Sequence, residues 1–124
     1  MYQLIRRHHI SFKNAIHGIE WALRTQPNFR VHIILSILAI LLGIFLKISQ
    51  AEMSVIFLTI VFGMGGEMIN TSIEEMTDLI TTEWKKEAKI AKDVSAGMML
   101  TIAVGALFVA SQIFIPKLIV LISK

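Results

Sequence analysis

Apolar residues fall into three long stretches along the chain, separated by short polar segments. The stretches cover residues 31–46, 53–69 and 94–115. A helix needs about 20 predominantly apolar residues to cross the hydrocarbon core of a bilayer, and each stretch reaches about that length with its flanks. The pattern predicts three transmembrane helices, at about residues 30–47, 52–70 and 94–115.

A different periodicity precedes the first stretch. Between residues 3 and 25, apolar residues such as Phe12, Ile16 and Ile19 recur at roughly helical spacing among basic and polar ones. This pattern is typical of an amphipathic helix that lies in the membrane surface. Residues 81–92 are polar and charged, and they are expected to form a helix or a turn in water. Residues 1–124 are therefore interpreted as one all-α integral membrane domain.

The composition also favours a membrane protein. Hydrophobic residues make up 55% of the chain and charged residues 17%, whereas an average soluble domain has roughly 25% charged residues. A soluble domain of this size could not bury so much apolar surface. The absence of cysteine excludes disulfides, thiolate metal sites and cysteine nucleophiles. No cleavable signal peptide is expected, because the basic N-terminal segment has no uninterrupted apolar core.

The distribution of basic residues predicts the orientation of the spans, since cytoplasmic loops carry an excess of lysine and arginine. Five basic residues precede the first span, four lie between the second and third spans, and three lie on the opposite side. Both richer segments, and with them the N-terminus, are expected to face the cytoplasm. The three groups are Arg6, Arg7, Lys13, Arg24 and Arg30; Lys85, Lys86, Lys89 and Lys92; and Lys47, Lys117 and Lys124.

A stripe of polar residues ends the second predicted span. At about 100° per residue, Asn70 and Glu74 lie about 60° and about 20° behind Glu67 around a helix. Asp78 lies about 20° ahead of Glu67, so the stripe covers less than a quarter of the circumference. Stacked carboxylates repel one another, and near a membrane they resist burial unless they are paired. A divalent cation is a natural partner, because Mg²⁺ binds carboxylate and phosphate oxygens together.

Lys92 and Asp93 follow the polar segment and extend this chemistry. Phosphoryl transfer needs a metal, cationic charge for the phosphates and a carboxylate that takes the proton of the attacking hydroxyl. Glu67 is the best candidate for the carboxylate, because an ionisable residue within an apolar span is a functional hypothesis by default. Glu75 and Glu83 are better explained as part of a solvated face.

A second class of function also fits an acidic residue in a membrane span. In a small proton-coupled transporter subunit, Glu67 would cycle a proton. That design needs an acid near the middle of the membrane, with water on both sides. Glu67 lies close to the cytoplasmic end of its span and its polar companions continue outward, so an enzyme is favoured over a transporter.

The polar stripe is part of a longer motif at residues 67–78 (Glu-x-x-Asn-Thr-Ser-x-Glu-x-x-x-Asp), which Lys92 and Asp93 follow. A second motif, at residues 25–32 (Thr-Gln-Pro-Asn-Phe-Arg-Val-His), precedes the first span. Together they resemble the signature of the prokaryotic diacylglycerol kinase family, which includes the undecaprenol kinases. The resemblance covers nearly the whole chain, including its length, its number of spans and its basic surface helix.

The resemblance implies a homotrimeric helical bundle of three-span subunits in the bacterial inner membrane, with active sites shared between neighbours at the cytoplasmic face. It implies ATP with Mg²⁺ as donor and a membrane lipid hydroxyl as acceptor. Glu67 would be the catalytic base and Glu74 a magnesium ligand, with Asp78 in a supporting role. It also implies that Asn70, Lys92 and Asp93 contact the nucleotide or orient the site, and that Arg7, Asn14, Glu83 and Lys85 make peripheral ATP contacts.

One position departs from the family pattern. Gln26 stands where the family often has a second acidic metal ligand on the N-terminal helix. Its carbonyl can coordinate Mg²⁺ but brings no charge. Three outcomes follow: metal affinity is weaker, Glu20 takes over, or activity is reduced, as in a non-catalytic relative of the family. Residues 25–32 and 115–117 (Ile-Pro-Lys) look more like those of undecaprenol kinases, so undecaprenol is favoured over diacylglycerol as the acceptor.

Overall fold

The computed structural model describes the backbone of residues 2–123 and the side chains of residues 11–123. Within this part of the chain, all regular structure is helical. The helices are α1 (Tyr2–Thr25), α2 (Pro27–Phe45), α3 (Gln50–Ile80) and α4 (Lys86–Ile122). Helices α2, α3 and α4 are each long and apolar enough to cross a membrane, which confirms the predicted all-α membrane fold.

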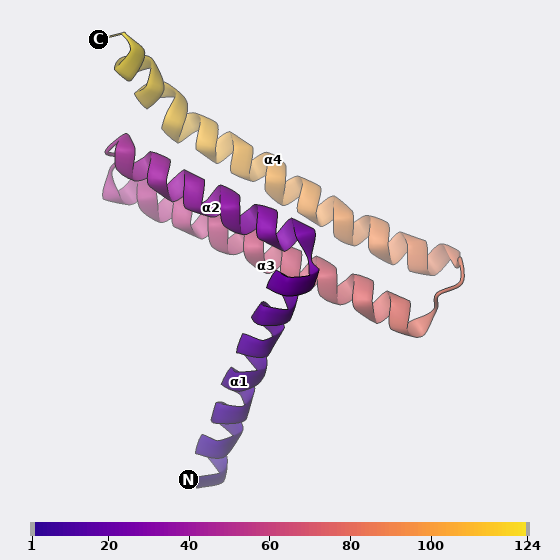
Figure 1. Ribbon diagram of the computed structural model, residues 1–124. Coiled ribbons are helices and arrows are strands. Elements are labelled where there is room, and N and C mark those ends of the chain that lie inside the picture. The colour runs from indigo at the N-terminus through magenta and orange to yellow at the C-terminus, as the bar shows by residue number, and fades with distance from the viewer. Residues whose placement is uncertain (1, 124) are drawn as a thin grey trace.

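The three long helices run alongside one another, and α1 projects away from them (Figure 1). The pairing of α3 with α4 is the most extensive, α2 packs on α3, and α1 makes few contacts with α2. At the end where α1 joins the bundle, α3 and α4 continue together beyond α2 (Figure 1). The last turns of α3, which carry the outer residues of the polar stripe, lie in this two-helix extension (Figure 1).

The break between α1 and α2 is a single residue. Gln26 has extended backbone there and makes no side-chain capping bond to α2. Helix α2 then starts at Pro27, a favourable position for proline because the first N–H groups of a helix have no intrahelical acceptor. Helix α1 covers the segment 3–25, where an amphipathic helix was predicted, and α2 overlaps the segment 30–47, where the first span was predicted.

Helices α3 and α4 are both longer than the spans predicted at 52–70 and 94–115. Helix α3 continues to Ile80 because neither glycine nor proline follows the predicted end of the span to stop it. Helix α4 passes through Pro116, and a proline is tolerated in membrane helices where the freed backbone groups find other partners. The polar segment predicted at 81–92 divides into a short irregular connection and the first turns of α4.

A tight turn joins α2 to α3 at the other end of the bundle. Lys47 has a φ of 51°, and its N–H donates to the carbonyl of Ile44 at 3.1 Å. The Ser49 hydroxyl then accepts from the N–H of Glu52 at 3.2 Å, and the Glu52 carboxylate accepts from the N–H of Ser49 at 2.6 Å. Such a reciprocal capping box defines the first residue of a helix. Glu52 also pairs with Lys117 of α4 at 3.4 Å, so the start of α3 is tied to α4.

Little of the apolar surface is buried within one chain. A small core forms around Ile56 of α3 and the neighbouring pair Ile113 and Phe114 of α4. Large apolar side chains elsewhere on the spans, such as Phe62 and Leu107, are exposed. Exposed apolar faces of this extent need lipid tails or other subunits against them.

Gly66 allows α3 to approach α4 closely beside Glu67. A Cβ atom added to Gly66 would lie 2.5 Å from Ile102 Cδ1 and 3.1 Å from Met99 Sδ. A Cβ atom added to the adjacent Gly65 would meet none of the described atoms of this chain within 4 Å. The two glycines therefore provide a matched pair for testing the packing of the helices at the stripe.

We expect Gly65→Ala to stabilise the protein and Gly66→Ala to destabilise it relative to that variant. Alanine favours a helix interior by about 1 kcal/mol over glycine, and at Gly65 nothing offsets the gain. At Gly66, Ile102 must change its rotamer or α4 must move, which costs about 1–3 kcal/mol. Thermal unfolding in detergent, followed by circular dichroism, measures the difference. Equal stability of the two variants would contradict the close packing.

Candidate active site

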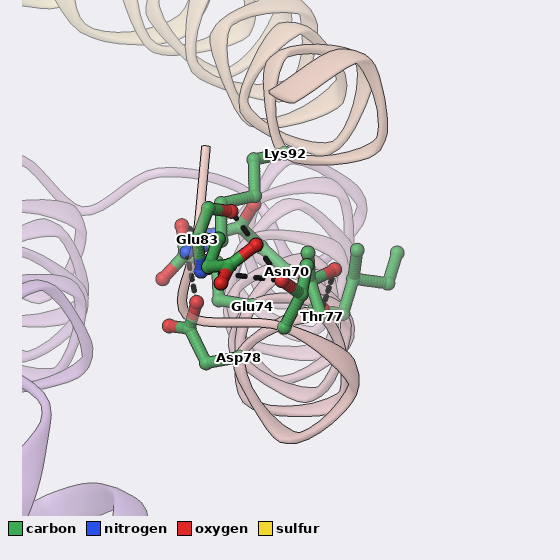
Figure 2. Close-up of polar contacts among 8 residues, drawn as sticks. Asn70, Glu74, Thr77, Asp78, Glu83 and Lys92 are labelled. Atoms are coloured by element: carbon green, nitrogen blue, oxygen red, sulfur yellow. Dashed lines mark hydrogen bonds and ion pairs between the residues drawn. The ribbon is translucent and has the colours of Figure 1, made fainter. Parts of the chain in front are cut away.

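Glu67, Asn70, Glu74 and Asp78 line one face of the last turns of α3, as predicted. Burial decreases along the stripe. Glu67 is 3% exposed and Asn70 6%, whereas Glu74 is half-buried and Asp78 exposed. Figure 2 shows Asn70, Glu74 and Asp78 together on α3, with Lys92 reaching them from α4. The stripe therefore connects a buried carboxylate inside the bundle with charged groups in contact with water.

A chain of hydrogen bonds joins two residues of the stripe to α4. The Ser95 hydroxyl donates to Asn70 Oδ1 at 2.6 Å, and Asn70 Nδ2 donates to Glu74 Oε1 at 3.0 Å. Ser95 is itself only 3% exposed, so the chain is shielded from water where it crosses between the helices. The sequence analysis missed Ser95, because this contact depends on the register of α4 against α3, which spacing along one helix does not reveal.

Lys92 and Asp78, both predicted site residues, form an ion pair between α4 and α3, with Nζ and Oδ1 2.6 Å apart. Asp93 instead pairs with Lys89 on its own helix and forms no hydrogen bond or ion pair with the stripe among the described side chains. Both pairs are partly exposed, so each contributes less than about 1 kcal/mol to stability. The main effect of the two pairs is to hold the ammonium groups of Lys92 and Lys89 close to Asp78 and Asp93.

The charges at this end of the bundle oppose the helix dipoles. A helix carries partial negative charge at its C-terminus and partial positive charge at its N-terminus. Helix α3 nevertheless has Glu74 and Asp78 in its last two turns and no basic residue in the last one. Helix α4 begins with Lys86 and Lys89, and Glu87 is the acidic residue of its first turn. Each opposed charge costs about 0.3–1 kcal/mol, and such local conflicts are expected at functional sites.

Glu67 is buried, yet in the part of the chain with described side chains its carboxylate has no hydrogen-bond or ion-pair partner. No fully enclosed side-chain oxygen or nitrogen lacks a partner there, so the oxygens of Glu67 remain accessible. His32 of α2 lies close by: its Nδ1 would be 3.5 Å from a Cβ atom on Gly63, one turn before Glu67 on the same face. An accessible carboxylate without a protein partner is suited to take a proton from a bound hydroxyl.

The peripheral residues are scattered. The side chain of Arg7 lies outside the described residues. Asn14 is exposed on α1, and no hydrogen bond joins it to the stripe within the described part of this chain. Glu83 and Lys85 pair with each other at 3.1 Å in the connection between α3 and α4. Of these four residues, the last two are therefore close in sequence and space to the outer end of the stripe.

The described side chains of one chain do not form a complete cage for a metal ion. No group of three acidic or histidine side chains converges among residues 11–123. Gln26 is half-buried at the start of α2, and Glu20 pairs with Arg24 at 2.6 Å on α1. Mg²⁺ usually binds one or two carboxylates, substrate phosphates and several waters. Glu74 fits that donor set, because Asn70 binds one of its oxygens and leaves the other free.

A cavity of about 580 Å³ lies beside the stripe but shares no residue with it. Its lining is mainly apolar and comes from the end of α3 and the start of α4, with Lys85 and Glu87 among the polar residues. Since the buried carboxylate and the paired charges converge at the stripe, we locate the candidate active site there and not in the cavity.

The fold and the site together define a class of small membrane proteins with several spans and an oxygen-rich polar site at one end of the bundle. The model of the prokaryotic diacylglycerol kinase family matches residues 13–114. This chain belongs to that family, as the motifs at residues 25–32 and 67–78 indicated.

Three relatives show how far the similarity extends. The chain is 37% identical over 108 residues to the undecaprenol kinase of Bacillus subtilis, which covers 87% of this chain and 88% of the relative. It is 33% identical over 111 residues to the diacylglycerol kinase of Synechocystis, covering 89% of this chain and 63% of the relative. It is 31% identical over 83 residues to a diacylglycerol kinase of Helicobacter pylori, and the alignment covers 67% of this chain and 65% of the relative.

Membership of this family confirms the enzyme interpretation. The protein is a lipid kinase of the diacylglycerol/undecaprenol kinase type, which is a phosphotransferase with an alcohol group as acceptor. It is a bacterial membrane protein that acts on a membrane lipid with a nucleotide as phosphate donor.

Proposed function

We propose that this chain, acting as a single domain of residues 1–124, phosphorylates a membrane lipid hydroxyl with ATP and Mg²⁺ at the cytoplasmic face. The observation that carries the proposal is the buried Glu67, which has no partner among the described side chains, at the inner end of a stripe whose outer end holds Glu74 and the Asp78–Lys92 pair. A lipid hydroxyl enters the site from the bilayer, and a nucleotide enters from water. The buried end of the stripe at Glu67 suits the first substrate, and the exposed end at Asp78 suits the second.

In the proposed reaction, Glu67 takes the proton of the lipid hydroxyl while the hydroxyl oxygen attacks the terminal phosphorus of ATP. The bond from that phosphorus to the bridging oxygen breaks, ADP leaves, and Glu67 later releases the proton to water. General base catalysis of this kind contributes about 10²–10⁴-fold to a rate. The buried position of Glu67 suits a hydroxyl group that cannot leave the membrane.

The remaining residues would position the nucleotide. Glu74, with the amide oxygen of Gln26, would hold Mg²⁺, which neutralises charge on the transferring phosphates. Lys92 of α4 would contact the phosphates, and Asp78 would hold the Lys92 ammonium group in place. Further nucleotide or orienting contacts are assigned, from the family resemblance, to Asn70 and Asp93 and, at the periphery, to Arg7, Asn14, Glu83 and Lys85.

We propose that undecaprenol is preferred over diacylglycerol. The preference is supported by the 37% identity with the undecaprenol kinase of Bacillus subtilis, which extends over 87% of this chain. It is also supported by the form of residues 25–32 and 115–117. The 33% identity with a diacylglycerol kinase is close to this value, so the two acceptors must be compared directly.

We further propose a homotrimer with the N-termini in the cytoplasm and active sites shared between subunits. Two observations support an oligomer. Glu74 belongs to no group of three acidic or histidine side chains within residues 11–123 of its own chain, and the spans leave large apolar faces exposed. A neighbouring subunit could cover those faces and bring its own α1 and Gln26 to the site.

The deciding experiment is a phosphotransfer assay on the purified protein in detergent, with undecaprenol and diacylglycerol offered in parallel. We expect Mg²⁺-dependent transfer from ATP, with a higher kcat/KM for undecaprenol. A higher kcat/KM for diacylglycerol would reverse the assigned preference. No transfer to either lipid, together with no Mg²⁺-dependent nucleotide binding by calorimetry, would support a non-catalytic relative.

Gln26→Glu should lower the Mg²⁺ concentration needed for half-maximal activity, by several-fold. The substitution places a carboxylate where the family often has an acidic metal ligand, and hard cations favour charged oxygen ligands. Asn28→Asp is the control, because it adds the same charge nearby on an exposed side chain. An equal effect of both substitutions would show that the added negative charge acts over a distance, and that residue 26 is not a metal ligand.

A further inference from the structure

Ser95 occupies a position in the site that the proposed reaction does not require. Its hydroxyl lies on α4, three residues after Lys92, and it donates to Asn70 Oδ1 at 2.6 Å. Both Ser95 and Asn70 are buried. A buried hydrogen bond between polar side chains of two helices is costly to leave unmade, so this contact constrains both partners.

Glu74 determines the orientation of the Asn70 amide, and Ser95 anchors the amide in that orientation. An ionised carboxylate only accepts hydrogen bonds, and an asparagine amide has one donor end and one acceptor end. With Nδ2 toward Glu74 at 3.0 Å, Oδ1 faces Ser95, which donates to it. In the reversed orientation two acceptor oxygens, Oδ1 and the Glu74 carboxylate, would face each other. Glu74 thus selects the orientation, and the Ser95 hydroxyl, which can donate or accept, donates to Oδ1 and holds the amide in place.

The orientation of Asn70 in turn fixes what Glu74 can offer a cation. Asn70 binds Oε1 of Glu74, so Oε2 is the carboxylate oxygen that remains available. The Asn70 N–H occupies one lone pair of Oε1, so this contact directs a cation toward Oε2. Mg²⁺ demands near-octahedral geometry at short distances, whereas the larger Ca²⁺ accepts two oxygens of the same carboxylate.

We infer that Ser95 is a positioning residue that, through Asn70, restricts Glu74 to binding a cation through one oxygen and so favours Mg²⁺ over Ca²⁺. The inference rests on the proposed function, in which Glu74 is a ligand of the magnesium ion. Without the Ser95 hydroxyl, Asn70 can rotate, and both oxygens of Glu74 become available to a larger ion.

The test compares Ser95→Ala with Ser111→Ala in the full-length protein. Ser111 is on the same helix, but its hydroxyl donates to the backbone carbonyl of Phe108 at 2.7 Å and forms no hydrogen bond with another helix among the described residues. Three quantities are measured for each variant. They are the Mg²⁺ and Ca²⁺ concentrations at half-maximal shift of the unfolding temperature, with a non-hydrolysable ATP analogue present, and the KM for the lipid in the kinase assay.

For Ser95→Ala we expect the half-maximal Mg²⁺ concentration to rise about two- to tenfold, which is the loss of one hydrogen bond's net contribution. The half-maximal Ca²⁺ concentration should stay the same or fall, and the KM for the lipid should not change. Ser111→Ala should match the wild type, and Ser95→Thr, which keeps the hydroxyl, should restore the Mg²⁺ value.

Three results would overturn the inference. The first is an unchanged ratio of the Mg²⁺ and Ca²⁺ concentrations in Ser95→Ala, and the second is the same change in Ser111→Ala. The third is failure of Ser95→Thr to behave differently from Ser95→Ala. All three leave the proposed function intact, since that function fails only if the wild type transfers no phosphate to a lipid.

Discussion

Glu67→Gln is expected to lower kcat for phosphate transfer by about 10²–10⁴-fold, the usual contribution of a general base. Glutamine keeps the shape and volume of the side chain but cannot accept the proton of the lipid hydroxyl. Because Glu67 has no hydrogen-bond partner among the described residues, the substitution breaks no protein contact. Stability should therefore change little, and the loss should appear in kcat with the KM values for ATP and lipid nearly unchanged.

Glu75→Gln is the matched control for this experiment. Glu75 lies on the same helix and carries the same charge, but it is exposed and outside the stripe. We expect it to retain wild-type kcat, as measured with radiolabelled ATP in mixed micelles. If Glu67→Gln kept full activity, the base would have to be another group. A similar loss in both variants would point to the summed negative charge of α3 and not to a single base.

Lys92→Met should raise the KM for ATP by about 10- to 100-fold. A hydrogen bond to a charged group is worth about 1.5–3 kcal/mol, and every 1.4 kcal/mol is a factor of ten in affinity. The substitution removes the cation proposed to contact the phosphates and leaves Asp78, its partner at 2.6 Å, without a countercharge. Repulsion between that free carboxylate and the nucleotide should add to the loss.

Lys86→Met is the control, since Lys86 is exposed at the first residue of α4. A double-mutant cycle with Asp78→Asn separates the two contributions of Lys92. If Lys92 contacts the nucleotide, Lys92→Met should still raise the KM for ATP when Asp78 is already asparagine. If the effect disappears in that background, Lys92 acts only by neutralising Asp78. An unchanged KM in Lys92→Met alone would remove Lys92 from the nucleotide site.

The spans and the stripe could be predicted because each depends on spacing within one segment. Apolar stretches identify membrane helices directly, and the helical period alone brings Glu67, Asn70 and Glu74 to one face. The far ends of the helices were harder to predict. Hydropathy marks where a helix leaves the bilayer and not where it stops, so α3 and α4 extend beyond the predicted spans to Ile80 and Ile122.

Contacts between helices could not be predicted in the same way. The partner of Asn70 is Ser95, 25 residues away, and it is defined by the register of α4 against α3. That register depends on the packing of Gly66 against Ile102 and on the length of the connection between the helices. Likewise, Lys92 and Asp93 both looked like site residues, but only Lys92 points across to the stripe, while Asp93 pairs along its own helix.

The uninterrupted course of α3 has a consequence for the membrane around it. At about 1.5 Å per residue, Glu67 lies about 26 Å along the helix from Gln50, and Asp78 about 42 Å. If Gln50 lies at one face of a hydrocarbon core about 30 Å thick, the proposed base Glu67 would lie just inside the other face and the outer carboxylates beyond it. The length of helix α3 would therefore set the depth of Glu67 in the membrane. In a thicker bilayer the lipid hydroxyl would lie farther out along α3 than the proposed base Glu67. Membrane thickness would then control how fast the lipid is phosphorylated.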